Sequence, residues 1–312
     1  SGGDGRARSG QPVPERPAQA RHGEAQGRRD GLHRLRTPAR RAGVLPLRQA
    51  MTAGARKAAL VTGAGRRLGA AMALYLAERG YDVAVHYATS GDDAEAVCAQ
   101  ARSHGVRAEA LGADLLDEGD MAALVPRAAA ALGGPLTVLV NNASIFERDT
   151  LASATRESWD RHIGSNLRAP FVLTQQFAAQ VPAMSTGGEP VATGLVVNMV
   201  DQRVLKLTPD FMTYTIAKMG LWALTQTSAQ ALAPNIRVNA IGPGPTVQGI
   251  RQSAEHFARQ RRSTVLRRGA DPSDITAALG YLIDARAVTG QLICVDGGQH
   301  LAWRTADILG VE

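Results

Sequence analysis

Tyr214 and Lys218 lie four residues apart, in the sequence Tyr-Thr-Ile-Ala-Lys, and their types suit proton transfer. A spacing of four places two side chains on one face of a helix, one turn apart. A tyrosine hydroxyl has a pKa of about 10 in water, too high for efficient acid–base catalysis at neutral pH. A lysine ammonium beside it lowers that pKa because it stabilises the phenolate. We therefore expect Tyr214 to transfer a proton, with Lys218 beside it.

Asp201, upstream of this pair, adds a carboxylate to the expected site. An ionised carboxylate accepts hydrogen bonds but cannot donate them, and it repels a developing oxyanion. Asp201 therefore suits a substrate that presents N–H donors or a ring nitrogen that takes up a proton, as a pterin does. The alternative is that Asp201 caps a loop and that the substrate's partner lies elsewhere.

A glycine-rich segment earlier in the chain predicts a phosphate site. The sequence Thr-Gly-Ala-Gly-Arg-Arg-Leu-Gly, residues 62–69, joins an apolar run to a helical pattern. Glycine lets the backbone approach a pyrophosphate, and the following helix N-terminus offers free N–H groups and partial positive charge. The alternative is a helix-starting turn with surface arginines. The residues expected to contact a dinucleotide here are Gly63, Gly65, Arg66, Arg67 and Leu68.

The residues after the second apolar run favour NADP(H) over NAD(H). A carboxylate at this point would accept the ribose 2′-hydroxyl and repel a 2′-phosphate. The chain reads His-Tyr-Ala-Thr-Ser at residues 86–90, with no acidic residue before Asp92. Thr89 and Ser90 can donate to the phosphate, and Arg66 can neutralise it. Tyr87 is expected to contact the same cofactor.

The elements that must position these residues follow an alternating pattern of short apolar runs and helical periods, typical of βαβ units. The fold class is therefore α/β: one doubly wound Rossmann domain, with a seven-stranded parallel sheet and helices on both faces. The expected strands are Ala58–Thr62, Asp82–Tyr87, Arg107–Gly112, Leu136–Asn141, Gly194–Met199, Arg237–Ile241 and Gln291–Val295. The expected helices are Leu68–Arg79, Asp92–His104, Glu118–Leu132, Trp159–Gln180, Thr213–Leu232 and Pro272–Asp284.

Two segments show neither pattern. Pro182–Pro190 is expected to be a polar turn. Gly242–Leu266 is longer and follows the sixth expected strand at its carboxyl end, the edge at which doubly wound sheets bind ligands. We expect irregular structure here, with residues 243–266 forming a loop that closes over the substrate.

With Tyr-x-x-x-Lys about 150 residues after the glycine-rich turn, the chain resembles the short-chain dehydrogenase/reductase family from about residue 56 to residue 303. The resemblance implies that Lys218 also holds the nicotinamide ribose and that Asn166 joins a proton relay through water. It implies that Asp114 and Leu115 contact the adenine, although Asp114 could instead cap the following helix. Other residues that it places near the cofactor are Asn141, Ala143, Ser144, Tyr214, Gly244 and Thr246.

Two departures from the usual family sequence resemble the pteridine reductases. Arg67 lies where the family usually has a glycine, and Asp201 lies where most members have a serine. Phe146, in Asn-Ala-Ser-x-Phe, resembles the segment with which pteridine reductases stack an aromatic ring on the pterin. The residues thereby assigned to substrate binding are Arg67, Ser144, Phe146, Asp201 and Tyr214.

The resulting hypothesis is an NADPH-dependent reductase of a pteridine such as dihydrobiopterin, dihydromonapterin or dihydrofolate. Hydride goes to a ring carbon, while Tyr214, supported by Asp201 and Lys218, supplies a proton directly or through water. One alternative is a reductase of carbonyls such as 3-oxoacyl thioesters, which a serine at position 201 and a glycine at position 67 would have favoured. Another, of a different class, is a dinucleotide-binding protein without catalytic activity.

The net charge of +7 belongs to the first 50 residues, which hold 11 arginines and four acidic residues. The remainder is neutral and has no general field for a polyanion, so we expect a small-molecule substrate and no nucleic-acid partner. We expect residues 1–53 to be a disordered basic leader and residues 54–312 to be the catalytic domain. One interpretation is that the natural protein begins at Met51; a basic arm or a transit-like peptide is the other.

Cysteine content and the length of the apolar runs indicate the expected compartment and membrane association. Cys98 and Cys294 are far apart and match no disulfide or zinc pattern, so we expect no metal and a reducing, cytoplasmic compartment. Apolar runs of about eight residues are far shorter than the ~20 that span a bilayer, so we expect no membrane partner. The family resemblance implies a homotetramer, joined through the two long helices that contain Asn166 and Lys218.

Overall fold

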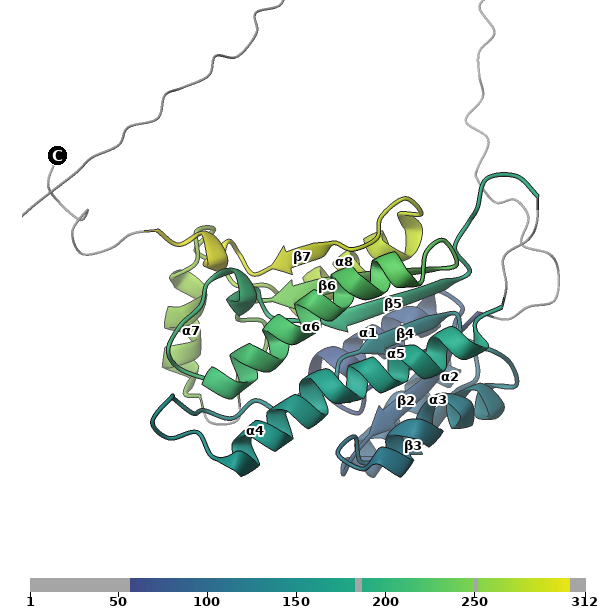
Figure 1. Ribbon diagram of the computed structural model, residues 1–312, viewed down its shortest axis with the longest axis horizontal. Helices are drawn as coiled ribbons and strands as arrows, with labels where there is room; N and C mark the ends of the chain where they lie inside the picture. Colours follow the sequence, from purple (N-terminus) through teal and green to yellow (C-terminus); the bar gives the residue numbers. More distant parts are fainter. Residues whose placement is uncertain (1–56, 183–186, 250–251, 304–312) are drawn as a thin grey trace, which may run out of the picture. The chain divides into compact units, whose positions relative to one another are not determined.

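The computed structural model describes residues 57–182, 187–249 and 252–303, all in one compact unit. The expected leader, residues 1–53, and part of the expected turn at Pro182–Pro190 lie outside the described residues. Within the described ranges, seven parallel strands form one sheet in the order β3-β2-β1-β4-β5-β6-β7, which confirms the predicted fold class (Figure 1). The strands are β1 (Ala58–Val61), β2 (Asp82–Tyr87), β3 (Ala108–Gly112), β4 (Val138–Asn141), β5 (Gly194–Met199), β6 (Ile236–Pro243) and β7 (Leu292–Val295).

The strand order changes direction between β1 and β4, which pair in parallel with Ala59 beside Val138. The crossovers that follow β1 and β4 run to opposite sides of this point. Loops after the two strands therefore diverge and leave a crevice at the carboxyl edge of the sheet. The chemistry-bearing residues all follow strands at this edge.

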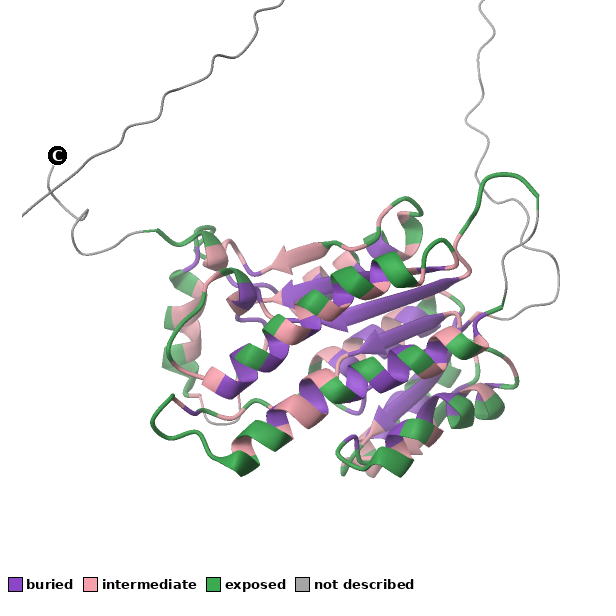
Figure 2. Ribbon diagram, viewed as in Figure 1, coloured by how far each residue is buried: buried purple, intermediate pink, exposed green. Residues whose placement is uncertain are grey.

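Helices cover both faces of the sheet, which explains why the strands are nearly continuous apolar runs. The helices are α1 (Arg67–Glu78), α2 (Gly91–Arg102), α3 (Glu118–Leu132), α4 (Arg156–Ile163), α5 (Ala169–Gln180), α6 (Met212–Ala231), α7 (Ala254–Arg262) and α8 (Pro272–Asp284). Every residue of β1, β4 and β5 is buried, and the strands in Figure 2 lie between helices whose outer sides are exposed.

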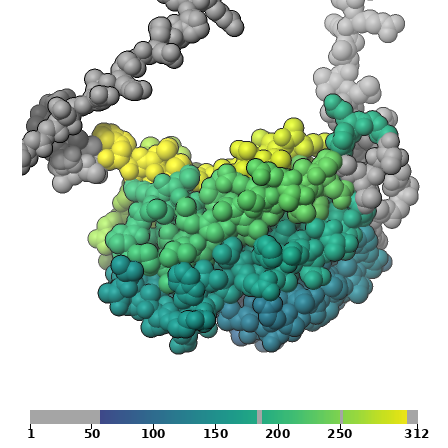
Figure 3. Space-filling view, viewed as in Figure 1, coloured from purple at the N-terminus to yellow at the C-terminus, as the bar shows by residue number. Residues whose placement is uncertain are grey.

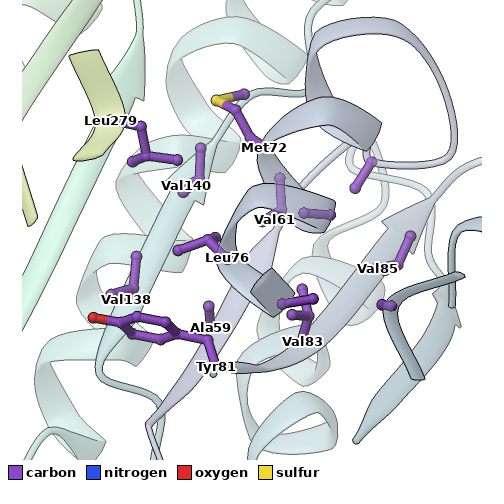
Figure 4. Packing of buried hydrophobic residues seen from close by; sticks show 14 of the residues in the cluster. Ala59, Val61, Met72, Leu76, Tyr81, Val83, Val85, Val138, Val140 and Leu279 are labelled. Atoms are coloured by element: carbon purple, nitrogen blue, oxygen red, sulfur yellow. The ribbon is translucent and has the colours of Figure 1, made fainter. Parts of the chain in front are cut away.

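Strand β1 shows how successive side chains divide between the two faces. Ala59 and Val61 pack with Met72 and Leu76 of α1 and with residues of α2 and α8, as Figure 4 shows for α1 and for Leu279 of α8. Ala58 and Leu60 point the other way and pack in a second cluster with α3, α5 and α6. The two clusters hold the carboxyl edge of the sheet in place between two layers of helices.

The long helix expected over Trp159–Gln180 is wrong in detail, because a π-helix, Gly164–Arg168, separates α4 from α5. The extra residue per turn matters because π-helical turns reorient side chains and often mark functional sites. Helix α4 also begins earlier, at Arg156, since Thr155 and Ser158 form a capping box. The apolar period alone does not distinguish a π-turn from an α-turn.

The expectation of irregular structure throughout Gly242–Leu266 is also wrong. Strand β6 continues to Pro243, and α7 lies inside the segment, beside the carboxyl ends of the strands (Figure 1). No residue of α7 is buried, so burial of an apolar face does not hold this helix in place. Polar contacts define it instead: Ser253 accepts a hydrogen bond from the His256 N–H at 3.1 Å.

The described residues contain no helix long and apolar enough to cross a membrane. Nor do three or more His, Cys, Asp or Glu side chains gather in a metal-binding arrangement anywhere in the part of the chain that the structure covers. Cys98 and Cys294 are both free thiols.

Candidate active site

A cavity of about 410 Å³ lies at the carboxyl edge of the sheet, between the glycine turn and the start of α6. Its volume is in the range typical of small-molecule sites. Many of the residues that the sequence assigned to cofactor or substrate contact line it together, although they come from distant segments. These are Arg66, Arg67, Leu68, Ala143, Ser144, Phe146, Asp201, Tyr214, Lys218, Gly244 and Thr246.

Asp201 and Tyr214 meet in this cavity. The Tyr214 hydroxyl donates a hydrogen bond to Oδ2 of Asp201 at 2.9 Å. Oδ1 of Asp201 accepts from the Arg203 backbone N–H at 2.8 Å and so caps a short 3-10 helix, Gln202–Leu205. Asp201 therefore does cap a turn through one oxygen, while its other oxygen faces the tyrosine; its contact with a substrate stays a prediction.

The carboxylate changes the electrostatics of the tyrosine. Burial raises the pKa of Tyr214 well above its usual value, and the charge and hydrogen bond of Asp201 raise it further. This direction is opposite to the one expected from Lys218 alone, because Asp201 lies at the hydroxyl and the ammonium does not. Tyr214 therefore keeps its proton at neutral pH, which suits a proton donor.

Lys218 is almost completely buried on the same helix as Tyr214. Its Nζ donates to the Met199 carbonyl at 2.7 Å and lies 5.7 Å from the centre of the Tyr214 ring. Burial lowers the pKa of Lys218 to about 8, although the charge of Asp201 acts in the opposite direction. The residue therefore links the end of β5 to α6 and places a cation at the floor of the cavity.

Asn166 lies in the π-helix, is fully buried, and does not line the cavity. Its amide donates to the Ile145 carbonyl and accepts from the Ile145 N–H, both at 2.8 Å. The side chain thus fixes the segment that carries Ser144 and Phe146. Its place in a water relay stays a prediction.

An aromatic wall flanks Tyr214. Phe146 stacks on Phe211, with ring centres 4.4 Å apart and planes 3° apart, and meets Tyr214 edge-on at 4.7 Å. Phe146 remains 51% exposed, so part of its surface is open to a ligand. Phe211 did not emerge from the sequence, because only the fold brings the residue before α6 against Phe146.

Side chains from β2 and from the segment after β4 fix the backbone of the glycine turn through hydrogen bonds. His86 accepts a hydrogen bond from the Gly63 N–H at 3.0 Å and contacts the Ala113 carbonyl at 3.1 Å through its other nitrogen. Burial lowers the pKa of His86, so the ring is neutral and donates to Ala113. Asn142 donates to the Thr62 and Gly63 carbonyls at 2.8 and 3.1 Å. The sequence did not suggest His86 as a site residue, whereas Asn142 belongs to the Asn-Asn-Ala-Ser segment that the family resemblance places near the cofactor.

The two arginines of the turn differ. Arg66 is mostly exposed and pairs with Asp93. Arg67 has a φ of 55°, a left-handed conformation that favours glycine, and its guanidinium donates to the Val247 carbonyl at 3.0 Å. Arg67 therefore joins the glycine turn to the segment after β6 across the cavity.

Other predicted cofactor residues lie outside this cavity: Gly63, Gly65, Tyr87, Thr89, Ser90, Asp114, Leu115 and Asn141. Ser90 is next to the turn, since a Cβ at Gly65 would come within 2.8 Å of its Oγ. Asp114 is not the cap of α3; Asp117 caps that helix, and Asp114 accepts from the Leu116 N–H at 2.9 Å. Asn141 donates to Asn198 at 2.8 Å, linking β4 to β5 inside the sheet.

Glutamines form a part of the lining that the sequence did not indicate. The residues concerned are Gln202, Gln252, Gln260 and Gln299, together with Phe257. Gln252, Phe257 and Gln260 come from in or next to α7, a helix with no buried residue. Gln299 follows β7, and only the sheet order brings it to the cavity.

A buried tyrosine–lysine pair beside a glycine turn, at the carboxyl edge of a doubly wound sheet, defines an oxidoreductase of the dinucleotide-binding class. A family model described as enoyl-(acyl carrier protein) reductase matches residues 63–300. The chain belongs to this family and, with it, to the short-chain dehydrogenases and reductases.

Individual relatives carry several substrate names. FolM alternative dihydrofolate reductase 1 from Brucella canis, solved with NADP, is 43% identical, with 81% of this chain and 97% of that chain covered and a TM-score of 0.75. Landomycin C-6 ketoreductase LanV, solved with NADP and rabelomycin, is 31% identical, with 79% and 97% covered and a TM-score of 0.70. The 3-oxoacyl-[acyl-carrier-protein] reductase FabG of Staphylococcus aureus strain Mu50 is 33% identical over 250 residues, with 78% of this chain and 98% of that protein covered.

Proposed function

We propose that the protein is an NADPH-dependent reductase of a pteridine-type substrate, such as dihydrobiopterin, dihydromonapterin or dihydrofolate. The observation that carries the proposal is the 2.9 Å hydrogen bond from the Tyr214 hydroxyl to Asp201 inside the cavity. The carboxylate offers only acceptors, so it favours a substrate with N–H groups over a carbonyl whose oxygen needs a donor. The exposed part of Phe146 offers an aromatic surface for a flat ring.

The chain suits a dinucleotide at the glycine turn. Within the described residues, no side chain caps the N-terminus of α1 and no acidic residue lies in its first turn, so the N–H groups there are available to phosphate. A Cβ at Gly69 would overlap the Gly63 carbonyl, so only glycine fits at position 69. Arg66, Thr89 and Ser90 are proposed to hold the 2′-phosphate of NADPH, and Lys218, Gly244 and Thr246 its nicotinamide half.

When bound, NADPH supplies a hydride for a ring carbon of the pteridine. Asp201 accepts hydrogen bonds from the ring's N–H groups and thereby orients the ring against the open part of Phe146. Tyr214, whose pKa burial and Asp201 raise, delivers its proton to the substrate directly or through water. Lys218 balances the negative charge that Tyr214 and Asp201 then share.

The comparisons support this proposal without separating it from carbonyl reduction. The FolM structure at 43% identity is named for dihydrofolate reduction, and LanV and FabG, at 31% and 33%, are named for reduction of ketone groups. A reductase of 3-oxoacyl thioesters or ketones is therefore the second candidate. Such a reductase would have to bind the carbonyl oxygen of its substrate beside Asp201, which offers no hydrogen-bond donor while ionised.

An NADPH-oxidation screen of the full chain tests the proposal. The substrates are dihydrobiopterin, dihydromonapterin and dihydrofolate on one side, and acetoacetyl thioesters and simple ketones on the other. We expect turnover of dihydropterins that disappears in Tyr214→Phe. Activity confined to ketones and thioesters would establish the second candidate, and the absence of any turnover would favour a dinucleotide-binding protein.

A further inference from the structure

A second cavity, of about 420 Å³, adjoins the catalytic one. Gln260 and Gln299 line both cavities, so the two spaces lie on either side of these amide side chains. The second cavity adds Lys206, His256 and Arg259, and no acidic residue lines it within the described part of the chain. Its lining is therefore basic, in a domain whose overall charge is neutral.

Helix α7 forms the wall between the two spaces. Phe257 and Gln260, three residues apart, line the catalytic cavity. His256, Arg259 and Ser263, spaced by three and four, line the second cavity. Residues at these spacings share a helix face, so adjacent faces of one helix serve the two cavities. A ligand that extends past Gln260 would therefore contact aromatic residues in the first cavity and basic side chains in the second.

The cations of the second cavity are free to meet an anion. Neither Lys206 nor Arg259 forms an ion pair among the described residues, whereas Arg261 on the same helix pairs with Asp271 at 2.9 Å. Lys206 is held in place by its Nζ, which donates to the Ala302 carbonyl at 3.0 Å. Two of its three donors remain available.

We infer that this second cavity binds an anionic arm of the substrate, a carboxylate or phosphate at the end of the pteridine's side chain. The inference rests on the proposed function, because it places the pteridine ring in the catalytic cavity. Gln260 and Gln299 each carry an amide donor and acceptor, which suits an amide-containing linker between ring and anion. Lys206 and Arg259 then bind the terminal charge. A carboxylate-bearing pteridine of the folate type fits this sequence of contacts.

The test compares substrates that share the ring and differ in the arm. Dihydrofolate carries two carboxylates, and dihydrobiopterin has an uncharged side chain. We expect Arg259→Glu to lower the ratio of kcat/KM for dihydrofolate to that for dihydrobiopterin by about fivefold or more, mainly through KM. Arg262→Glu makes the same charge change on the same helix but does not line this cavity, and it should leave the ratio unchanged. The effect should shrink with added salt.

The outcomes separate the two proposals. Turnover of dihydrobiopterin, dihydromonapterin or dihydrofolate by the parent protein reports the proposed function, and the absence of turnover with all three would refute that function and this inference with it. Turnover with an unchanged ratio in Arg259→Glu, or an equal fall in Arg262→Glu, would overturn the inference alone. Arg259→Gln provides the same comparison if the charge reversal prevents folding. A dihydropterin with a phosphate-terminated side chain distinguishes the sources: a fall for dihydrofolate alone identifies a carboxylate site, and a fall for both identifies a general anion site.

Discussion

Asp201 contacts the hydroxyl of Tyr214, the residue that we propose transfers the proton. Its Oδ2 lies 2.9 Å from the Tyr214 hydroxyl, and its charge adds to burial in raising the pKa of Tyr214. A tyrosine alone would be a poor base and a poor acid at neutral pH. Beside a carboxylate and buried, the tyrosine stays protonated at neutral pH.

Replacing Asp201 with serine should therefore cut dihydropterin reduction by about 10²–10⁴-fold, because the partner that orients the ring and the tyrosine is lost. NADPH affinity should stay nearly unchanged, and weak ketone reduction should appear because serine supplies a donor. Steady-state kinetics and NADPH titration measure both. Asp210→Ser, which removes an exposed carboxylate paired with Arg148, is the control. Full dihydropterin activity in Asp201→Ser would show that this carboxylate has no catalytic role.

The burial of Lys218 predicts a pH dependence of stability. Its pKa is about 8 in the fold against 10.5 for an ordinary lysine, so between these values the unfolded chain binds the proton more strongly. The contribution of Lys218 to stability therefore rises with pH across this window, by up to roughly 3 kcal/mol. Urea unfolding at pH 8 and pH 10 should show that rise in the parent protein and not in Lys218→Met. Lys57→Met, at a partly exposed lysine, is the control; identical pH dependence in all three proteins would contradict the prediction.

At the scale of elements, three buried and hydrogen-bonded side chains, Asp149, His162 and Thr213, fix the start of α6; we call this group the clasp. Thr213 donates from its hydroxyl to Asp149 at 2.5 Å and from its N–H to the same carboxylate at 3.1 Å. His162 lies 2.7 Å from the Thr213 hydroxyl, and its Nε2 accepts from the Glu147 N–H at 3.2 Å. The clasp therefore joins α4, the Phe146 segment and α6 next to Tyr214.

Removing the Thr213 hydroxyl should loosen this clasp. Thr213→Val removes the hydroxyl that Asp149 and His162 both contact but keeps the N–H bond to Asp149, and we expect a loss of about 1–3 kcal/mol in unfolding free energy. The value of kcat should fall more than NADPH affinity, because the tyrosine moves and the glycine turn does not. Thr227→Val, at an exposed threonine on the same helix, is the control for both measurements. Equal effects of the two substitutions would rule out a specific positioning role.

The elements that the sequence predicted well are those whose signals are local. Helix α3 has the expected bounds because Asp117 caps it and Gly133 ends it in a left-handed conformation. Helix α7 escaped prediction because none of its residues is buried, and the π-helix did so because its apolar spacing is ordinary. The site residues differ in the same respect, since only those with a local sequence signal were predicted. Tyr214 and Lys218 are a local pair, whereas Phe211 and His162 acquire their neighbours only through tertiary packing.

At the scale of the whole molecule, the outer surface of α4–α6 predicts association. Trp159, Phe171, Ile216 and Met219 are large apolar side chains that remain exposed on these helices. The surface of Figure 3 that faces the reader is formed largely by this teal and green part of the chain. Burying such side chains between subunits is favourable, in keeping with the expected homotetramer.

A double substitution, Phe171→Asp with Ile216→Asp, should reduce the assembly to smaller species, because two charges per subunit would have to be buried. Light scattering after size exclusion measures the mass in units of the 32.8 kDa chain. Val191→Asp, at an exposed apolar residue outside these helices, should leave the mass unchanged. A parent protein that already runs as a monomer would contradict the expected tetramer.

The proposed substrate-binding role of Arg67 would set stability against activity within one residue. Its left-handed backbone, with a φ of 55°, is a conformation that costs about 1 kcal/mol for most residues and nothing for glycine. Its guanidinium nevertheless reaches the Val247 carbonyl at 3.0 Å across the catalytic cavity. Variants of position 67 selected only for heat resistance should therefore converge on glycine, while variants selected for turnover should keep arginine. Selection for heat resistance and selection for turnover would therefore favour different residues at position 67.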